Sequence, residues 1–254
     1  KRHRTFSVVA AAALGAMTLA SCSPSSALSP DTVGSSSTES DAVQRSLDAL
    51  VSEDGLPAAL ASIQDRNGNS HNYTAGVGDL TTGSEVPPNG QIRIGSNTKT
   101  FTAVVVLQLV AEGKIELDTP IETYLPGLVR GDGIDGHNIT IRQLLSLSSG
   151  IAGGESGQVP SYKQALAQAK VTGAPGTRFQ YGPIPYQIFG EVMRRKLVAS
   201  GKAKDPLDYL QQRLFTPLGM KYELWREDGD KMPHLPSGAF FTAREWAKFG
   251  LFVL

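Results

Sequence analysis

The sequence predicts an α+β fold in which an antiparallel sheet is flanked by helices and accompanied by a mostly helical region. Two segments of strand character, LPAALASIQD and HNYTAGVGD, enclose the turn NGNS, whose Asn67-Gly68 pair is a strong hairpin signal. Apolar residues at helical spacing precede and follow this hairpin, and they dominate from about residue 115 to 225. We therefore expect a folded domain at 41–254, with a helical subdomain at about 115–225.

The first 40 residues are expected to lie outside this fold. A basic KRHR segment followed by the apolar TFSVVAAAALGAMTLA is typical of a secretory signal peptide, which we place at residues 1–21. The apolar part is short for a membrane span, although a short anchor helix is an alternative. Residues 22–40 are rich in Ser and offer little apolar surface to bury, which predicts a flexible tether.

The composition bears on possible partners and cofactors. The 24 basic and 24 acidic residues balance, and no block of like charge points to nucleic acid. The single cysteine, Cys22, excludes an intramolecular disulfide. The four His residues do not stand at metal-ligand spacing, so we expect neither a metal nor an organic cofactor.

Signals for helix ends mark the individual elements. The segment DAVQRSLDALV has apolar residues at helical spacing after Asp41, and the helix that follows the hairpin should end at Gly113. Later helices are expected behind three further signals: a capping-box spacing at Thr140 and Gln143, the pair Asp205-Pro206, and a second capping-box spacing at Thr242 and Glu245.

The segment RIGSNTKTFTAVVVLQLVAEGK places a hydroxyl and an amine on one helix face, because Ser96 and Lys99 are three residues apart. The free N–H groups and positive dipole end of a helix start would stabilise an oxyanion near Ser96. The same positive, apolar surroundings favour a neutral Lys99 that can accept the Ser proton, which creates a nucleophile without His. The alternative is a Ser N-cap beside a Lys that reaches solvent, but the uniformly apolar helix after Lys99 favours a functional pair.

The segment IRIGSNTKTFTAVVVLQLVAEGKIELDTPIETYLPGL resembles the first signature of the serine β-lactamase and D-alanyl-D-alanine carboxypeptidase family, which includes class C β-lactamases and related carboxylesterases. The similarity continues through ITIRQLLSLSSGI, PGTRFQYGP and LFTPLGM, and covers roughly residues 50–254. It implies a β-lactamase/transpeptidase-like fold and acyl transfer through Ser96, with Lys99 and Tyr181 handling the proton. The implied substrate is a small molecule or a peptidoglycan peptide.

The sequence LASC at the end of the signal resembles the lipobox of bacterial lipoproteins, in which the Cys is lipidated after cleavage. The resemblance implies that Cys22 is the lipid attachment site. The exported protein would then be anchored to a bacterial membrane in the cell envelope, facing outside the cytoplasm. An ordinary signal peptide with a coincidental Cys is the alternative.

Two departures from the family pattern bear on activity. The family's Tyr-x-Asn, whose Asn holds the Lys and the substrate amide, is Tyr181-Gly182-Pro183 here, and Pro has no side-chain donor or acceptor and no backbone N–H. We therefore expect esters to be hydrolysed better than amide-bearing substrates such as penicillins. The third signature, Lys-Thr-Gly or His-x-Gly, does not occur, and in the family its strand lies beyond Leu254. We expect the C-terminal strands to be missing, and the 254-residue chain itself to be inactive and poorly soluble.

Two other functions compete with this interpretation. A Ser-His-Asp hydrolase would need a G-x-S-x-G elbow, which the sequence lacks. A non-catalytic or slowly acylated penicillin-recognising cell-wall lipoprotein stays open because of Pro183. The substrate stays open as well, because TYLPGLVRGDGIDGHNITIRQLL favours the DD-carboxypeptidases whereas FQYGPIPYQIFGEVMRRKL favours β-lactamase-related hydrolases and esterases.

Overall fold

The computed structural model describes residues 35–131, 133–153, 159–198 and 201–254. The expected signal peptide at 1–21 and the expected lipid attachment site Cys22 lie outside these residues. In the described part of the chain, no helix is long and apolar enough to cross a membrane.

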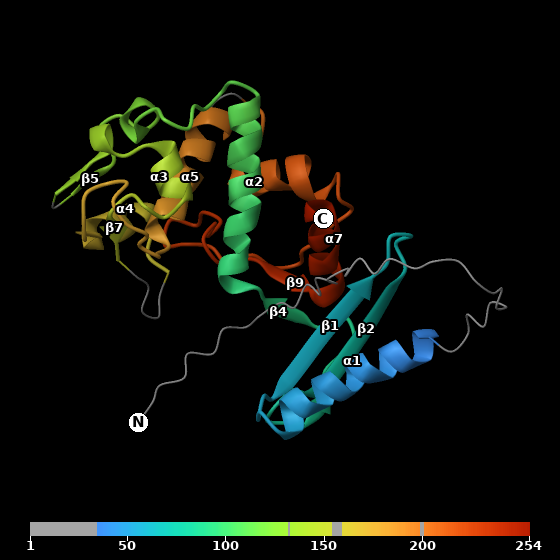
Figure 1. Ribbon diagram of the computed structural model, residues 1–254. Coiled ribbons are helices and arrows are strands. Elements are labelled where there is room, and N and C mark those ends of the chain that lie inside the picture. The colour runs from blue at the N-terminus through green and yellow to red at the C-terminus, as the bar shows by residue number, and fades with distance from the viewer. Residues whose placement is uncertain (1–34, 132, 154–158, 199–200) are drawn as a thin grey trace, which may run out of the picture.

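An antiparallel sheet with packed helices forms one side of the molecule (Figure 1). Its strands run in the order β1-β2-β3, and helices α1 and α7 contact it. This arrangement confirms the predicted α+β class. The elements on this side are β1 (Ala58–Gln64), β2 (Ser70–Asp79), β3 (Ser84–Glu85), α1 (Ser35–Ser52) and α7 (Ala243–Val253).

The hairpin between β1 and β2 lies where the Asn-Gly pair predicts it. The Asp65 carboxylate accepts hydrogen bonds from the backbone N–H groups of Asn67 (2.8 Å) and Asn69 (2.9 Å), which holds the turn closed. The strands then pair in register from Ala58 opposite Gly76. A hydrogen bond from the Asn69 side-chain amide to the carboxylate (2.8 Å), together with these backbone bonds, lowers the pKa of Asp65, because it stabilises the charged form.

Helix α1 begins earlier than the sequence predicts. It starts at Ser35, so part of the segment expected to be a flexible tether is helical, whereas the expected start was Asp41. Later in this helix, Leu47 is buried and the Gln44 amide donates to the backbone oxygen of Thr74 in β2. Once these contacts fix the downstream turns, each added residue gains a helical hydrogen bond at little cost, and the helix extends into the Ser-rich stretch.

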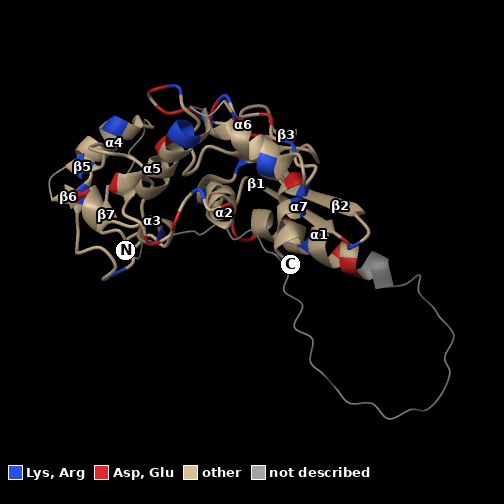
Figure 2. Ribbon diagram, turned by 90° about the horizontal axis from the view of Figure 1, so that it is seen from above, with Lys and Arg blue, Asp and Glu red and all other residues tan. Residues whose placement is uncertain are grey.

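The helical region is inserted between two short strands that pair with each other. β4 (Gln91–Arg93) lies antiparallel to β9 (Phe240–Thr242), with Ile92 opposite Phe241. Viewed from above, α2 (Thr98–Ala111) lies between the sheet and two other inserted helices, α3 (Ile141–Leu145) and α5 (Ile184–Met193) (Figure 2). The inserted elements are α2 (Thr98–Ala111), β5 (Arg130–Gly131), β6 (Ile134–Asp135), α3 (Ile141–Leu145), β7 (Ile151–Ala152), α4 (Tyr162–Gln168), β8 (Lys170–Val171), α5 (Ile184–Met193) and α6 (Pro206–Leu210).

Most of the predicted helix starts carry the expected caps. Thr140 and Gln143 form the complete reciprocal box before α3, and the Asp205 carboxylate accepts from two backbone N–H groups at the start of α6. At α7 only half of the box forms. Thr242 accepts from the N–H of Glu245, but the Glu245 carboxylate instead accepts from the backbone N–H of Lys221 (2.6 Å). A tertiary contact has replaced the local one.

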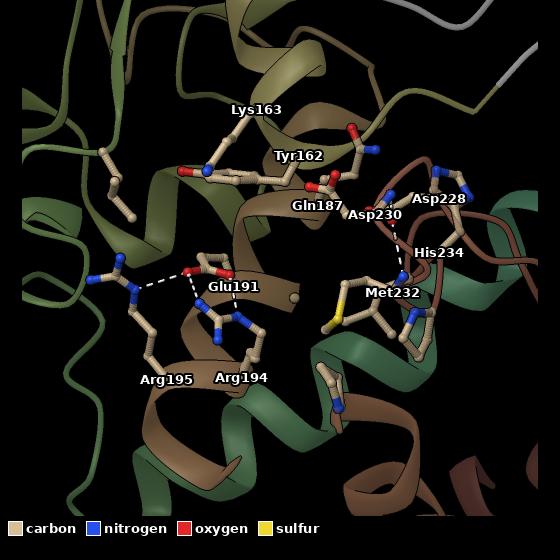
Figure 3. A pocket seen from close by; sticks show the side chains of 15 residues that line it. Tyr162, Lys163, Gln187, Glu191, Arg194, Arg195, Asp228, Asp230, Met232 and His234 are labelled. Carbon is tan, nitrogen blue, oxygen red and sulfur yellow. Dashed lines mark hydrogen bonds and ion pairs between the residues drawn. The ribbon is translucent and has the colours of Figure 1, made fainter. Parts of the chain in front are cut away.

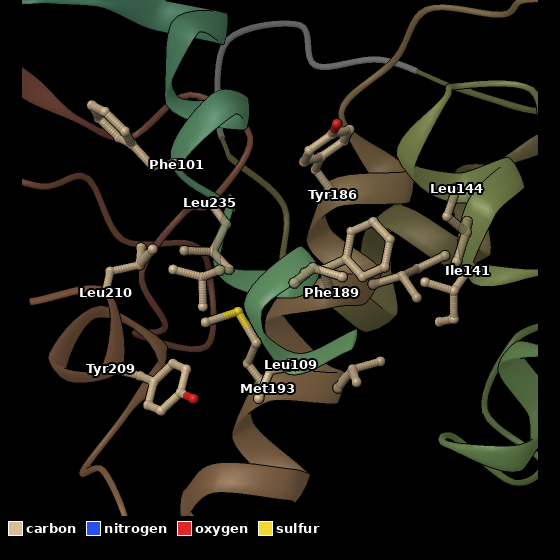
Figure 4. Packing of buried hydrophobic residues seen from close by; sticks show 14 of the residues in the cluster. Phe101, Leu109, Ile141, Leu144, Tyr186, Phe189, Met193, Tyr209, Leu210 and Leu235 are labelled. Atoms are coloured by element: carbon tan, nitrogen blue, oxygen red, sulfur yellow. The ribbon is translucent and has the colours of Figure 1, made fainter. Parts of the chain in front are cut away.

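The core is built around α2, as its nearly unbroken apolar sequence predicts (Figure 4). Phe101 is fully buried, and its ring lies 4.9–5.4 Å from the rings of Phe215, Phe241, Trp246 and Phe249. These rings come from three other elements, namely the helical turn Gln211–Phe215, β9 and α7, so a single α2 side chain joins the helical region to α7 and β9. Aromatic pairs at this separation stabilise a fold beyond the area they bury.

Candidate active site

Ser96 lies in a tight turn that leads directly into α2. Residues Gly95–Asn97 form a single 3-10 turn, and the Thr98 hydroxyl donates to the Gly95 backbone oxygen (2.6 Å). The Ser96 side chain does not cap α2, because the helix has Asn97 at its N-cap position and no side-chain cap bond. The simple N-cap alternative for Ser96 is therefore wrong, and its hydroxyl is available for other contacts.

Lys99 is buried, with 7% of its surface exposed, so it does not reach solvent as the alternative required. Its Nζ atom lies 3.0 Å from Ser96 Oγ and 3.4 Å from the hydroxyl of Tyr181. It also lies 3.0 Å from the backbone oxygen of Pro236. The structure thus brings all three sequence-predicted side chains together around one amine.

Two aromatic rings border the same amine. Lys99 Nζ is 5.0 Å from the ring centroid of Tyr181 and 5.8 Å from that of Tyr186. The two tyrosines differ in their polar ends. The Tyr186 hydroxyl donates to the backbone oxygen of Leu145 (3.0 Å) and burial raises its pKa, which keeps it neutral, whereas Tyr181 is 52% exposed. Tyr181 can therefore meet both Lys99 and a molecule entering from solvent.

The loop that carries Tyr181 is held by the turn after α3. Gly176 N–H donates to Ser148 O (2.7 Å), and Gln180 N–H donates to Leu147 O (2.7 Å) immediately before Tyr181. Gly150 allows this close approach, because it has φ +76° and a Cβ there would overlap the backbone oxygen of Gly173. The turn at residues 147–150, within the segment ITIRQLLSLSSGI, therefore positions Tyr181 through backbone contacts.

The segment 234–238 supplies the carbonyl group that contacts Lys99, and the sequence reasoning missed it. Neighbouring atoms fix this segment: Trp225 Nε1 donates to His234 O (3.2 Å), and the Arg93 guanidinium donates to Ser237 O (3.1 Å) and Ser237 Oγ (2.8 Å). A backbone carbonyl has no sequence signature, so only the structure could identify the contact from Pro236.

His234 is 1% exposed and lies in this segment, with Nδ1 3.1 Å from Ser237 Oγ. Burial lowers its pKa to about 3, and the positive charges of Arg226 and Arg93, and of Lys99 when it is protonated, act in the same direction. The imidazole is therefore neutral near pH 7. The other two described His residues do not approach Ser96: His71 lies in β2, and His137 contacts Asp135.

No three His, Cys, Asp or Glu side chains in the described residues gather closely enough to hold a metal ion. The chemistry available at the site is that of a hydroxyl, an amine and a phenol in contact.

Comparison with known proteins places this arrangement in a family. A family model described as Beta-lactamase matches residues 43–251, which is most of the chain. The chain belongs to the beta-lactamase family. This confirms the family and the fold that the SxxK segment and its flanking sequence suggested.

Two relatives show how much of a longer protein the chain covers. Penicillin-binding protein 4 of Amycolatopsis lactamdurans is 36% identical over 185 residues, covering 70% of this chain and 47% of that protein. Protein flp of Staphylococcus aureus strain MW2 is 23% identical over 204 residues, covering 75% of this chain and 40% of that protein. The chain thus spans less than half the length of these two curated relatives.

Solved structures give the same assignment of fold. A D-stereospecific amidohydrolase from Streptomyces sp. superposes with a TM-score of 0.62 at 27% identity, covering 83% of this chain and 71% of that chain. The D-amino acid amidase of Ochrobactrum anthropi SV3, complexed with D-phenylalanine, gives a TM-score of 0.68 at 22% identity, covering 84% and 71%. The latter likeness concerns the fold alone.

Pro183 is where this beta-lactamase-family site departs from the Tyr-x-Asn pattern. It stands immediately before α5, and its backbone oxygen accepts from the N–H groups of Tyr186 (3.0 Å) and Gln187 (3.1 Å). Its role is therefore to start a helix, and its ring offers no hydrogen bond to Lys99 or to a ligand. The Pro236 carbonyl oxygen contacts the Lys99 amine instead.

Proposed function

We propose that this protein is a serine hydrolase that forms an acyl-enzyme at Ser96 and acts on esters, β-lactams or peptidoglycan-type peptides. One observation carries the proposal: the buried Lys99 amine lies 3.0 Å from Ser96 Oγ and 3.4 Å from the Tyr181 hydroxyl. A nucleophile, a base and a second proton carrier within hydrogen-bond reach are what acyl transfer requires. Similarity to a penicillin-binding protein and to a D-stereospecific amidohydrolase supports the same reaction type.

The proposed reaction begins when neutral Lys99 takes the Ser96 proton as Oγ attacks the substrate carbonyl carbon. The negative charge that develops on the carbonyl oxygen would be met by the backbone N–H of Ser96, which donates no hydrogen bond within the described residues. Tyr181 then gives its hydroxyl proton to the leaving group and takes the proton held by Lys99, which restores both side chains. The leaving group departs as an alcohol or amine, or, in a β-lactam, the ring opens and the amine stays attached to the acyl group. Water attacks the acyl-Ser96 ester by the reverse proton route and releases the acid.

We further propose that esters are better substrates than amides for this site. An amide-bearing substrate would miss the side-chain contact that the family's Asn provides, and Pro183 cannot replace it. A buried polar group that loses its hydrogen bond costs about 1–3 kcal/mol. A substrate that carries an ester in place of the amide has fewer polar groups to leave unpaired, so it loses less. A Pro183→Asn variant should raise kcat/KM for a penicillin more than for a p-nitrophenyl ester. Equal kcat/KM for both substrates in the unaltered protein would contradict this preference.

The test of the main proposal is covalent labelling. The protein is mixed with a p-nitrophenyl ester or a penicillin, quenched in acid, and the adduct is located by peptide mass spectrometry. We expect the acyl group on Ser96, formed slowly because these 254 residues lack the family's third signature, and none in a Ser96→Ala variant. Ser84→Ala is the matched control, because Ser84 is exposed on β3, away from this site. An adduct that persists in Ser96→Ala would refute the assignment of the nucleophile.

A second candidate function is a penicillin-recognising lipoprotein that acylates slowly or not at all. Pro183 favours this second function, because the Asn that the family has at this position also helps to hold the Lys, and Pro cannot make that contact. The same labelling experiment separates the two functions. An adduct that forms and disappears with release of free acid supports the hydrolase, whereas an adduct that is stable for hours supports the lipoprotein.

The location proposed from the sequence is the cell envelope, with a lipid on Cys22. This rests on the basic and apolar segments before LASC. In bacteria fed labelled palmitate, we expect label in the protein and none in a Cys22→Ala variant. Label that survives in Cys22→Ala would contradict the assignment of the anchor.

A further inference from the structure

A cavity of about 400 Å³ lies between α5 and the segment 228–235 (Figure 3). None of Ser96, Lys99 and Tyr181 lines it. Its volume falls within the range of small-ligand sites, about 300–1,000 Å³. The cavity therefore has the size of a binding site and is separate from the proposed hydrolytic one.

The two sides of the cavity carry opposite charges. Figure 3 shows the basic residues Lys163, Arg194 and Arg195 on the left of the view, and the acidic residues Asp228 and Asp230 on the right. On the basic side, part of the charge is already neutralised. The Glu191 carboxylate lies 2.7 Å from the Arg194 guanidinium and 2.9 Å from that of Arg195, which leaves this side with a net positive charge.

The acidic side is held rigidly by its own turn. Asp228 Oδ1 accepts from the backbone N–H groups of Asp230 (2.9 Å) and Met232 (3.0 Å). Both bonds go to the same oxygen, so Oδ2 is left for another donor. Burial raises the pKa of Asp228, and the charges of Asp230 and Glu227 act in the same direction. A cation placed beside Asp228 would relieve this unfavourable desolvation.

A buried acceptor between the two sides has no hydrogen-bond partner among the described residues. Gln187 is only 6% exposed, and its Nε2 donates to Pro160 O (3.1 Å), but its Oε1 accepts no hydrogen bond within the described residues. The hydroxyl of Tyr162 also lacks a partner there. A buried polar atom left unpaired costs about 1–3 kcal/mol, and most such atoms in folded proteins are paired. Both residues line the cavity, so a ligand that donates hydrogen bonds would satisfy them.

We propose that this cavity binds a short peptide that carries a free α-ammonium group and a free α-carboxylate. The ammonium, with three N–H donors, meets Asp228 and the orphan Gln187 Oε1. The carboxylate meets Lys163 and the arginines on the opposite side. The site is a second binding site, and the proposal does not depend on hydrolysis at Ser96.

The test is a titration of the protein with glycylglycine, followed by NMR chemical shifts. Two blocked analogues each test one end of the peptide. N-acetylglycylglycine lacks the ammonium, and glycylglycinamide lacks the carboxylate. We expect glycylglycine to bind at least about tenfold more tightly than either analogue, a difference of about 1.4 kcal/mol. Equal affinity for all three peptides, or no saturable binding at about 10 mM, would overturn the proposal.

Variants locate the bound peptide. Asp228→Asn keeps the Oδ1 acceptor of the turn but removes the charge, and it should weaken glycylglycine binding about tenfold. Asp54→Asn removes the same charge from an exposed residue that does not line the cavity, and it should leave binding unchanged. If Asp228→Asn does not fold, Lys163→Met at an exposed position tests the other end. Binding lost in Ser96→Ala but kept in Asp228→Asn would move the peptide to the hydrolytic site and refute the proposal.

Discussion

The burial of His234 predicts that acid destabilises this protein well before its carboxylates are protonated. His234 is 1% exposed and its pKa is lowered from 6.5 to about 3, chiefly by burial. The charges of Arg226 and Arg93, and of Lys99 when it is protonated, add to this effect. The unfolded chain therefore binds a proton at His234 near pH 6.5, and the folded protein does not.

The sign and size of the effect follow from linkage. The stability associated with a neutral His234 is fully present above pH 6.5 and is lost as the pH falls towards 3, because only the unfolded state gains the proton. From pH 7 to pH 5 the free energy of unfolding should fall by about 2 kcal/mol. The size depends on the unfolded pKa alone, because pH 5 is still far above the folded value.

The assay is urea unfolding at pH 7, 6 and 5, followed by the fluorescence of Trp225 and Trp246. A His234→Asn variant keeps a polar side chain near Ser237 and removes the titration, so its stability should fall much less between pH 7 and 5. His71→Asn is the control, because His71 is exposed on β2. Identical pH dependence in the unaltered protein and His234→Asn would refute the reasoning.

One other group acts in the opposite direction. Burial raises the pKa of Asp228, so the folded protein takes up this proton more readily than the unfolded chain, and stability is gained as the pH falls through that pKa. The unaltered protein and His234→Asn both contain Asp228, so the difference between their two curves isolates His234.

Three further substitutions test the packing and the proposed chemistry. Lys99→Met removes the proposed base and should slow acylation of Ser96 about 10²–10⁴-fold, measured by mass spectrometry against time; an unchanged rate would exclude the role. Gly238→Ala places a Cβ 2.5 Å from His234 O, and it should cost about 1–3 kcal/mol in urea unfolding. Phe101→Ala empties the centre of the aromatic cluster and should cost about 3–5 kcal/mol, whereas a loss below about 1 kcal/mol would show that the cluster collapses around the gap.

The sequence predicted those parts of the fold that depend on residues close together in the chain. The Asn67-Gly68 turn and the Thr140–Gln143 capping box each involve residues a few positions apart, so the local sequence is enough to predict them. The pairing of β4 with β9 joins segments about 150 residues apart, and each strand is only three residues long. Nothing in such short strands specifies the partner, because the choice is made by packing around α2.

The residues of the candidate site likewise differ in how far the sequence could predict their contacts. Ser96 and Lys99 are three residues apart on one turn, so their contact follows from helix geometry. Tyr181 was reached only through the resemblance to a family, because its loop is placed by backbone bonds to the turn after α3. Pro236 could not be predicted at all, since it acts through a carbonyl oxygen that every residue has.

The contact from Pro236 bears on what Pro183, in place of the family's Asn, changes at the site. If the Asn were needed to hold the amine, its loss would leave Lys99 misplaced, yet Lys99 Nζ lies 3.0 Å from both Ser96 Oγ and the Pro236 carbonyl oxygen. That carbonyl lies between His234, held by Trp225, and Ser237, held by Arg93, so it is a rigid acceptor. What Pro183 removes is therefore the hydrogen bond to the substrate amide rather than the positioning of the base. On the proposed mechanism, we therefore expect Pro183 to affect which acyl groups are selected more than whether Ser96 is acylated.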